Sequence, residues 1–282
     1  MSIAAVNNQQ TDLATTTLPS ELFGTSLNVT LLDLSVALGP HISEAVPVEL
    51  EPMNHCCGGD HLAELVGTER SELQGELGWA SERVSAITHS STHIDSPFHY
   101  APKCAGQPSR TIDEMPLDWF CGRGVCISVQ QDTDELIRIE EVMQFELEKG
   151  YRIQAGDIVL FHTGAEAFYG VSDYNEHGRG LSPELVRYLV KDRGVRLFGT
   201  DAWSIDPPFH VMNRNMLNLG KDTVWGAHYV GRDHEFCAME KLTHLSWLPA
   251  HGFWLTCFPI KVKNGSAGWV RAVAYLPQGG LE

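Results

Sequence analysis

The sequence predicts one α/β or α+β domain in which strands outnumber helices. Short runs of β-branched and other apolar residues recur along the chain, and segments with helical spacing lie between several of them. The chain has 282 residues, of which 43% are hydrophobic, so it can bury a sizeable core, and no linker divides it. No apolar run approaches the roughly 20 residues that crossing a bilayer requires, so no membrane partner is expected.

The individual elements follow from local patterns in chain order. A helix is expected over Ile139–Lys149, because apolar residues recur with helical spacing up to Gly150. A second helix is expected to begin at Ser182 and Pro183, a good cap and first-turn residue, and to end near Gly194. Residues 41–82 show little periodicity and predict a long loop region with short elements. Strands are expected at residues 29–34, 84–88, 124–129, 156–162, 195–199, 253–260 and 269–276.

The N-terminal residues 1–28 are expected to form a flexible arm, and residues 29–282 the domain. Residues 1–18 are polar and lack a basic region followed by an apolar stretch, so they predict neither a signal peptide nor a membrane anchor. Their Asn, Gln and Thr content also fits a strap over a neighbouring subunit, although a mobile arm is the commoner arrangement.

Charge and cysteine content limit the partners and the compartment. The formal charge is −16, so the protein repels phosphate backbones, and no nucleic-acid partner is expected. The seven cysteines are odd in number and form no C-x-x-C pair, which argues against a disulfide framework. We expect reduced thiols and a cytoplasmic location.

One segment concentrates the residues that bind metals. His89, His93, Asp95 and His99 lie within eleven residues, after the strand predicted at 84–88. If the backbone stays extended, their even spacing directs all four to one side, and a loop could also bring them together. Imidazole and carboxylate groups are the usual ligands of Zn²⁺ and also suit Mn²⁺ or Fe²⁺. The alternative is a chance cluster of polar loop residues.

These residues alone leave a metal ion short of ligands. Spacing does not choose among the later candidates, each of which is more often a surface or hydrogen-bonded core residue than a ligand. The histidines concerned are His162, His177, His210, His228, His234, His244 and His251.

The segment His89-Ser-Ser-Thr-His-Ile-Asp-Ser-Pro-Phe-His99 resembles the motif H-x-G-T-H-x-D-x-P-x-H of the cyclase family. That family contains bacterial kynurenine formamidases, isatin hydrolases and trans-dienelactone hydrolase. Ser91 stands where the motif has Gly, which often marks a backbone angle that Ser adopts at a cost. The resemblance implies a single-domain α/β fold of the swivelling β/β/α type over residues 29–282. Further similar stretches follow in the family's order at 33–35, 156–164, 199–207 and 268–274.

The resemblance also implies roles for individual residues. His89, His93 and Asp95 match the ligands of a first metal ion. In members with two ions Asp95 bridges them, while His228 binds the second ion and Glu240 contacts both. The resemblance thus implies one or two divalent ions per chain, Zn²⁺ or Mn²⁺, and a homodimer or homotetramer.

Three residues outside the set of ligands, His99, Asp201 and Ser204, are further candidates, and the ligand Glu240 has a possible second role. His99 matches a histidine that carries a proton, and Glu240 is the alternative proton carrier. Asp201 and Ser204 are candidates for contacts that support the ligands. Their alternative role is packing and turn formation at a strand end.

These assignments predict a hydrolase. A metal-bound hydroxide would attack the carbonyl carbon of a small amide, cyclic amide or lactone, in the catabolism of an aromatic-derived compound. His99 would take the proton from water and return it to the departing atom. The tryptophans that could line an aromatic wall are Trp79, Trp203, Trp225 and Trp269.

Two other classes remain open at this point. A non-haem iron oxygenase could use His93, Asp95 and a distant histidine as a facial triad, and it would be expected on a jelly roll. A non-catalytic metal-binding protein would have closed coordination and no use for a free His99.

Overall fold

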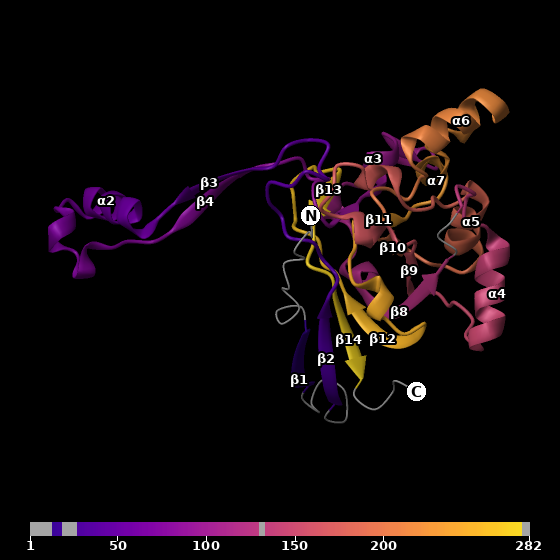
Figure 1. The fold of residues 1–282 in the computed structure, drawn as a ribbon, viewed down its shortest axis with the longest axis horizontal. Helices are drawn as coiled ribbons and strands as arrows, with labels where there is room; N and C mark the ends of the chain where they lie inside the picture. The colour runs from indigo at the N-terminus through magenta and orange to yellow at the C-terminus, as the bar shows by residue number, and fades with distance from the viewer. Residues whose placement is uncertain (1–12, 19–26, 130–132, 278–282) are drawn as a thin grey trace, which may run out of the picture.

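The computed structural model describes residues 13–18, 27–129 and 133–277, and a ten-stranded mixed sheet forms its centre (Figure 1). Two two-stranded sheets accompany it, β3 with β4 and β6 Lys103–Cys104 with β7 Gln107–Pro108. In spatial order the large sheet contains β1 Leu13–Leu18, β2 Leu27–Asp33, β14 Val273–Pro277, β12 His251–Thr256, β8 Cys121–Ser128, β9 Ile158–His162, β10 Leu197–Thr200, β11 Cys237–Glu240, β5 His93–Asp95 and β13 Ala267–Trp269.

The middle of this sheet is parallel and fully covered. β8, β9, β10 and β11 run parallel to one another, whereas the flanking strands pair antiparallel. Residues of β9 alternate between two hydrophobic clusters, Val159 and Phe161 in one and Ile158 and Leu160 in the other. A strand that is buried on both faces has a continuous run of apolar residues, which explains why β9 was predictable from the sequence.

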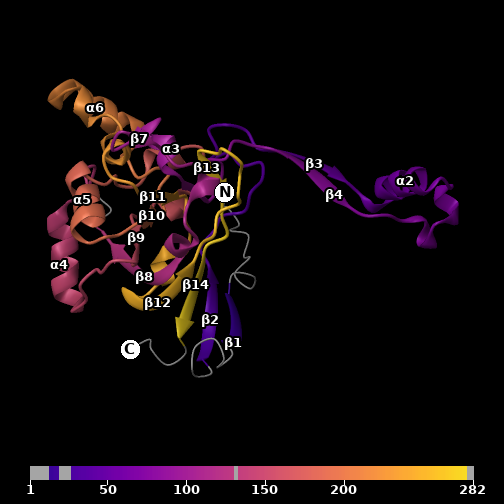
Figure 2. The ribbon, with the colours of Figure 1, turned by 180° about the vertical axis from the view of Figure 1, so that it is seen from behind.

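Helices cover one face of the parallel strands (Figure 2). The cluster on this face joins Val142 and Phe145 of α4 to Leu185 and Val186 of α5. The cluster on the other face joins the parallel strands to β2, β12 and β14. The α-helices are α2 His55–Val66, α3 Pro97–Tyr100, α4 Ile139–Lys149, α5 Pro183–Arg187, α6 Phe209–Leu219 and α7 Gly226–Tyr229.

The ends of α4 and α5 confirm the predicted signals. α4 ends at Gly150, whose φ of 60° is in the left-handed region that glycine adopts without a steric cost. The Ser182 side chain accepts a hydrogen bond from the Leu185 amide at the start of α5. The helical backbone then continues through a π-helical turn to Asp192, so the element ends near Gly194 as expected.

Residues 41–82 contain more structure than the predicted loop. β3 Glu49–Met53 and β4 Ser81–Ser85 form a hairpin that, with α2 at its tip, projects far from the sheet (Figure 1). We call residues 47–86 the arm. β4 ends earlier than the strand predicted at 84–88, because it pairs with β3 and does not lead directly into the histidine segment.

The tip of the arm depends on two glycines. A Cβ atom at Gly58 would lie 1.8 Å from the backbone oxygen of Trp79, and one at Gly78 would lie 2.3 Å from the backbone oxygen of Gly58. The start of α2 therefore packs directly on the backbone of the segment that leads into β4. Only glycine permits so close an approach.

The expected N-terminal arm, residues 1–28, lies partly outside the described residues. Within it, Leu13–Leu18 forms β1, which pairs antiparallel with β2 at the edge of the sheet. Among the described helices, none is both long and apolar enough to span a membrane.

Candidate metal centre

The histidine segment folds as a turn, a short strand and a helical turn. Only His93–Asp95 is a strand, β5, so the backbone is not extended throughout 89–99, and the other possibility left open by the sequence, convergence through turns, is the one observed. Ser91 has a φ of 53°, which turns the chain between His89 and β5, as the substitution of the motif's glycine suggested. Pro97 starts α3, which carries His99. The four predicted side chains converge nevertheless.

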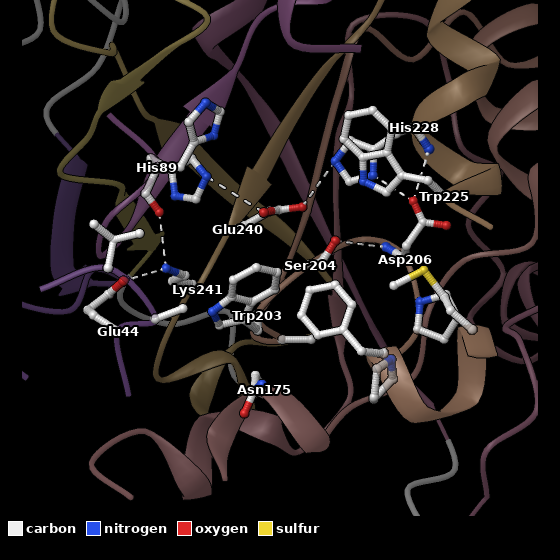
Figure 3. A pocket seen from close by; sticks show the side chains of 18 of the residues that line it. Glu44, His89, Asn175, Trp203, Ser204, Asp206, Trp225, His228, Glu240 and Lys241 are labelled. Atoms are coloured by element: carbon white, nitrogen blue, oxygen red, sulfur yellow. Dashed lines mark hydrogen bonds and ion pairs between the residues drawn. The ribbon is translucent and has the colours of Figure 1, made fainter. Parts of the chain in front are cut away.

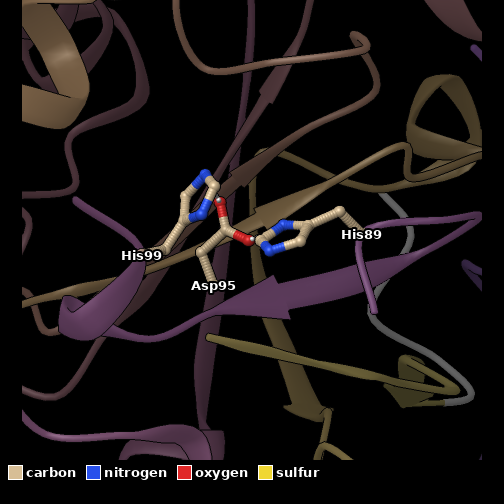
Figure 4. Close-up of side chains that lie close together, drawn as sticks. All are labelled: His89, Asp95 and His99. Atoms are coloured by element: carbon tan, nitrogen blue, oxygen red, sulfur yellow. Dashed lines mark ion pairs between the residues drawn. The ribbon is translucent and has the colours of Figure 1, made fainter. Parts of the chain in front are cut away.

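Asp95 lies at the centre of the cluster, fully buried (Figure 4). Its Oδ1 atom is 2.8 Å from Nδ1 of His89 and 3.3 Å from Nε2 of His93. Its Oδ2 atom is 3.6 Å from Nε2 of His228 and 3.9 Å from Nε2 of His99. Each oxygen of the carboxylate thus faces a different pair of imidazoles.

Glu240 joins the same cluster from β11 (Figure 3). β11 pairs with β5 so that Glu240 lies opposite His93. Its Oε2 atom is 3.6 Å from Nε2 of His93, and its Oε1 atom is 3.5 Å from Nε2 of His228. His228 comes from α7 and is buried. All five residues predicted as ligands therefore meet at one place.

The chemistry of these atoms fits a divalent cation. Nε2 of His93 and both carboxylate oxygens of Asp95 are buried and lack a well-oriented hydrogen-bond partner among the described residues. Buried polar atoms without partners are costly unless something else satisfies them. Ligand atoms lie within 4.8 Å of one another in two sets that share Asp95, namely His89–Asp95–His99 and His93–Asp95–Glu240. Nitrogen and oxygen donors of this kind suit Zn²⁺ or Mn²⁺.

Hydrogen bonds orient three of the imidazoles. Nδ1 of His93 lies 2.9 Å from the carbonyl oxygen of Ser91, and Nδ1 of His228 lies 2.6 Å from Oδ2 of Asp206. Nε2 of His89 lies 3.0 Å from the Ser266 hydroxyl. In each ring the other nitrogen faces the carboxylates, the arrangement that fixes the tautomer of a metal-binding histidine.

Charge within the cluster shifts the ionisation of its members. Burial opposes the protonated form of His228, but hydrogen bonds to Asp206 and Asp95 outweigh it and raise the pKa of His228 to about 10. Burial and the negative charge of Asp95 raise the pKa of Glu240. Burial opposes ionisation of Asp95, and the surrounding histidines hold its pKa well below the usual range. Without a cation, the raised pKa values of His228 and Glu240 favour the protonated forms of these two side chains.

His99 differs from the other histidines at the site. Its side chain is 26% exposed, and among the described residues neither ring nitrogen has a hydrogen bond. Its ring centroid lies 4.1 Å from that of His89 and 5.3 Å from that of Trp225. Burial lowers the pKa of His99 to about 4, so the ring is neutral near neutral pH.

A cavity of about 360 Å³ opens above the cluster, large enough for a small-molecule ligand (Figure 3). Trp203 and Trp225, two of the four tryptophans proposed from sequence, line it, and Phe209 adds a third aromatic ring. The Trp225 ring stacks on His228 with centroids 4.5 Å apart. Trp79 lies instead in the arm, and Trp269 bonds through its indole nitrogen to the Ile87 carbonyl.

Known proteins share this chain's sequence pattern. The Cyclase family model matches residues 32–207. A kynurenine formamidase from Salinibacter ruber is 31% identical over 72% of this chain and 82% of its own length. An isatin hydrolase from Roseibium aggregatum is 28% identical over 67% of this chain and 72% of its own length.

This chain belongs to the Cyclase family. Solved structures share its fold, among them isatin hydrolase A from Ralstonia solanacearum, with a TM-score of 0.70 and 21% identity over 93% of this chain and 100% of that one. Isatin hydrolase A from Labrenzia aggregata, bound to benzyl benzoate, gives a TM-score of 0.68 at 23% identity, covering 88% of this chain and 94% of that one. The Cyclase-family α/β fold is confirmed, and the chain is a metal-dependent hydrolase.

Two supporting residues of this Cyclase-family protein lie in the stretch 199–207. Oδ1 of Asp201 accepts hydrogen bonds from the amide and hydroxyl of Thr163, and Oδ2 accepts one from the Glu166 amide, so these contacts organise loops and reach no predicted ligand. Ser204 lines the cavity, and its hydroxyl accepts a hydrogen bond from the Asp206 amide. Its contact to the ligands is therefore indirect.

Asp206 is the functional residue that sequence reasoning missed. Besides holding Nδ1 of His228, its carboxylate accepts hydrogen bonds from the amides of Ala227 and His228. The neighbouring Ile205 amide donates to Oε1 of Glu240 at 2.9 Å. The similar stretch at 199–207 contains Asp206, but its position in the sequence did not connect this residue to His228.

A third group, His162, Glu166 and Asp201, has ligand-type atoms close together. Backbone amides occupy the oxygens of Asp201, and the amides of Leu245 and Ser246 bond to Glu166. These hydrogen bonds explain the group without an ion. The iron-oxygenase alternative fails on the fold, because a mixed sheet with helices on one face is not a jelly roll.

Proposed function

We propose that this protein hydrolyses a small amide, cyclic amide or lactone that carries an aromatic group, in the catabolism of an aromatic-derived compound. The observation that carries the proposal is the set of buried, unpartnered atoms of His93 and Asp95 beside an aromatic-lined cavity. The kynurenine formamidase and isatin hydrolase names of its relatives support a C–N bond as the target.

The proposal assigns two divalent ions, Zn²⁺ or Mn²⁺, to one chain. Oδ1 of Asp95 faces His89 and His93, while Oδ2 faces His228, and the two oxygens of Glu240 face His93 and His228 separately. Because each carboxylate divides its oxygens between different imidazoles, His89, His93, Asp95, His228 and Glu240 could hold two ions better than one.

A bound divalent ion supplies a Lewis acid for the carbonyl and lowers the pKa of a water molecule. The side chains of the protein transfer the proton and bind the substrate. His99 is neutral, partly exposed and 3.9 Å from Asp95, so its Nε2 atom can take a proton at the base of the cavity and return it to the departing atom. Trp203, Trp225 and Phe209 bind the aromatic part of the substrate and exclude water around it.

A substrate panel tests this function. Protein loaded with Zn²⁺ or Mn²⁺ should hydrolyse aryl formamides, cyclic amides or aryl lactones, and removal of the metal with a chelator should abolish turnover while the circular dichroism spectrum is retained. Matched alkyl compounds without the ring should have a higher KM. If no compound of any class turns over, or if a chelated sample remains fully active, the proposal is wrong.

We further propose a homodimer or homotetramer in the cytoplasm. The arm supports assembly because it exposes several large apolar side chains away from the body, among them Leu65, Leu77 and Trp79. All seven cysteines are free, which fits a reducing compartment. Analytical ultracentrifugation checks the assembly: a monomer at micromolar concentration would contradict it. Cell fractionation checks the location.

A further inference from the structure

A buried ion pair lies beside the metal ligands and outside them. Glu44 precedes the arm, and Lys241 follows the ligand Glu240 (Figure 3). Nζ of Lys241 is 2.7 Å from Oε2 of Glu44, and the two side chains are only 3% and 2% exposed. Charges buried this deeply are kept only when they are paired and hydrogen-bonded, so each depends on the other.

Glu44 contacts two residues with strained backbones. Ser91 and Lys241 have φ angles of 53° and 58°, in the left-handed region that residues other than glycine adopt at a cost. Oε1 of Glu44 accepts a hydrogen bond of 2.7 Å from the Ser91 amide, while Oε2 holds the Lys241 side chain. One carboxylate therefore bonds to both strained residues.

Each strained residue is connected to metal ligands. The Ser91 carbonyl accepts the hydrogen bond from Nδ1 of His93, which directs Nε2 of that ring at Asp95. Lys241 is adjacent to Glu240, and its Nζ atom donates to the His89 carbonyl at 3.0 Å. A shift of the backbone at 91 or 241 would turn these ligands away from one another.

A further hydrogen bond joins the two strained segments. The Thr92 hydroxyl donates to the Lys241 carbonyl at 2.6 Å and accepts a bond from the Val36 amide. This bond connects residues 92 and 241, whereas Glu44 is the partner of the Ser91 amide among the residues that the structure describes. The two contacts thus have separate roles.

We propose that Glu44 is a positioning residue for the metal ligands: it holds Ser91 in its left-handed conformation through the Ser91 amide, fixes the Lys241 side chain against the His89 carbonyl, and thereby sets the geometry of His89 and His93. The inference rests on the proposed function only through the existence of the metal site. It explains how this chain keeps serine where the family motif has glycine, because a buried carboxylate stabilises the angle that glycine would adopt freely.

A metal titration with a glycine rescue tests this role. Glu44→Gln keeps the size of the side chain but removes its charge. We expect it to weaken Zn²⁺ binding, measured by competition with a chromophoric chelator, by tenfold to hundredfold. Adding Ser91→Gly to this variant should restore the Zn²⁺ affinity by at least half of the lost logarithm of the Kd. Glu49→Gln, in the exposed strand β3, is the matched control and should bind Zn²⁺ like the wild type.

If Glu44→Gln does not fold, Glu44→Gln with Lys241→Met removes the unpaired charge together with its partner, and the rescue is measured on that background. Wild-type affinity in the Glu44 variant would overturn the proposal, and so would a loss that Ser91→Gly does not reduce. A structural defect alone predicts no rescue, because glycine adds conformational freedom to the unfolded chain. Failure of the proposed function would appear differently, as a wild-type protein that binds metal but hydrolyses nothing in the panel.

Discussion

The imidazole of His99 shows how position decides the role of a residue. Three neighbouring imidazoles are held through their second nitrogen by Ser266, Ser91 and Asp206, whereas His99 lies at the edge of the cavity without such an anchor among the described residues. A histidine free in water has a pKa near 6.5. Burial instead lowers its pKa to about 4, which makes it a proton acceptor throughout the neutral range.

Substituting His99 separates proton transfer from metal binding. His99→Asn should keep near-normal metal content and lose about a hundredfold to ten-thousandfold in kcat, the usual contribution of a general acid–base. A base works only when deprotonated, so the acidic limb of the wild-type pH–rate profile should lie well below pH 6.5. Metal loss in proportion to activity would show that His99 is a ligand, and unchanged turnover would transfer the role to Glu240.

The metal-free protein should lose stability as the pH rises. The pKa of His228 is about 10 when folded, above the unfolded value near 6.5, because of Asp206 and Asp95. Its contribution is therefore complete below pH 6.5 and lost as the pH rises toward 10, at up to ~1.4 kcal/mol per pH unit.

Chemical denaturation of the apoprotein between pH 6.5 and 10 measures this loss. His228→Gln should flatten the decline, although it lowers stability at every pH. An equally steep decline in that variant would show that another group titrates. Bound metal should also reduce the decline, because it needs the unprotonated ring.

Among the helices and strands, those whose apolar spacing and end residues lie within the segment itself were predicted correctly. The helix Ile139–Lys149 has the predicted bounds, because its apolar spacing and Gly150 act within the segment itself. The hairpin of β3 and β4 was missed because almost all of its residues are solvent-exposed and β4 contains a single apolar residue, Val84. Spacing alone left open whether His89 to His99 converge through an extended backbone or a loop, and the structure shows turns, because Ser91 and Pro97 bend the chain on either side of β5.

The arm offers a test of packing within one element. In Gly58→Ala the added methyl group meets the Trp79 backbone oxygen, which cannot move aside like a flexible side chain. We expect this substitution to destabilise the arm tip by about 1–3 kcal/mol and to increase hydrogen exchange over residues 55–80. Zn²⁺ affinity should remain that of the wild type, because α2 lies far from the cluster (Figure 1).

Cys57→Ala is the control, since it changes an exposed neighbour in the same helix. Hydrogen exchange followed by mass spectrometry compares the two variants. Unchanged protection in Gly58→Ala would show that the tip does not depend on the close approach of α2 to Trp79.

At the scale of the whole molecule, the site joins segments that are distant in the sequence. The first motif supplies His89 to His99, while Asp206, His228 and Glu240 come from a later part of the chain. Family resemblance predicted His228 and Glu240, but residue spacing could not choose between His228 and the other late histidines. The fold makes that choice, because α7 places Nε2 of His228 3.6 Å from Oδ2 of Asp95 and 3.5 Å from Oε1 of Glu240.

If the cluster around Asp95 binds catalytic metal ions, the metal content of the purified protein must depend on its ligands. Elemental analysis after saturation with Zn²⁺ and gel filtration should give about two ions per wild-type chain, and His93→Ala should lose most of the bound metal. His228→Ala should lose the second ion. A full complement of metal in His93→Ala, or wild-type protein that retains no metal, would contradict the account.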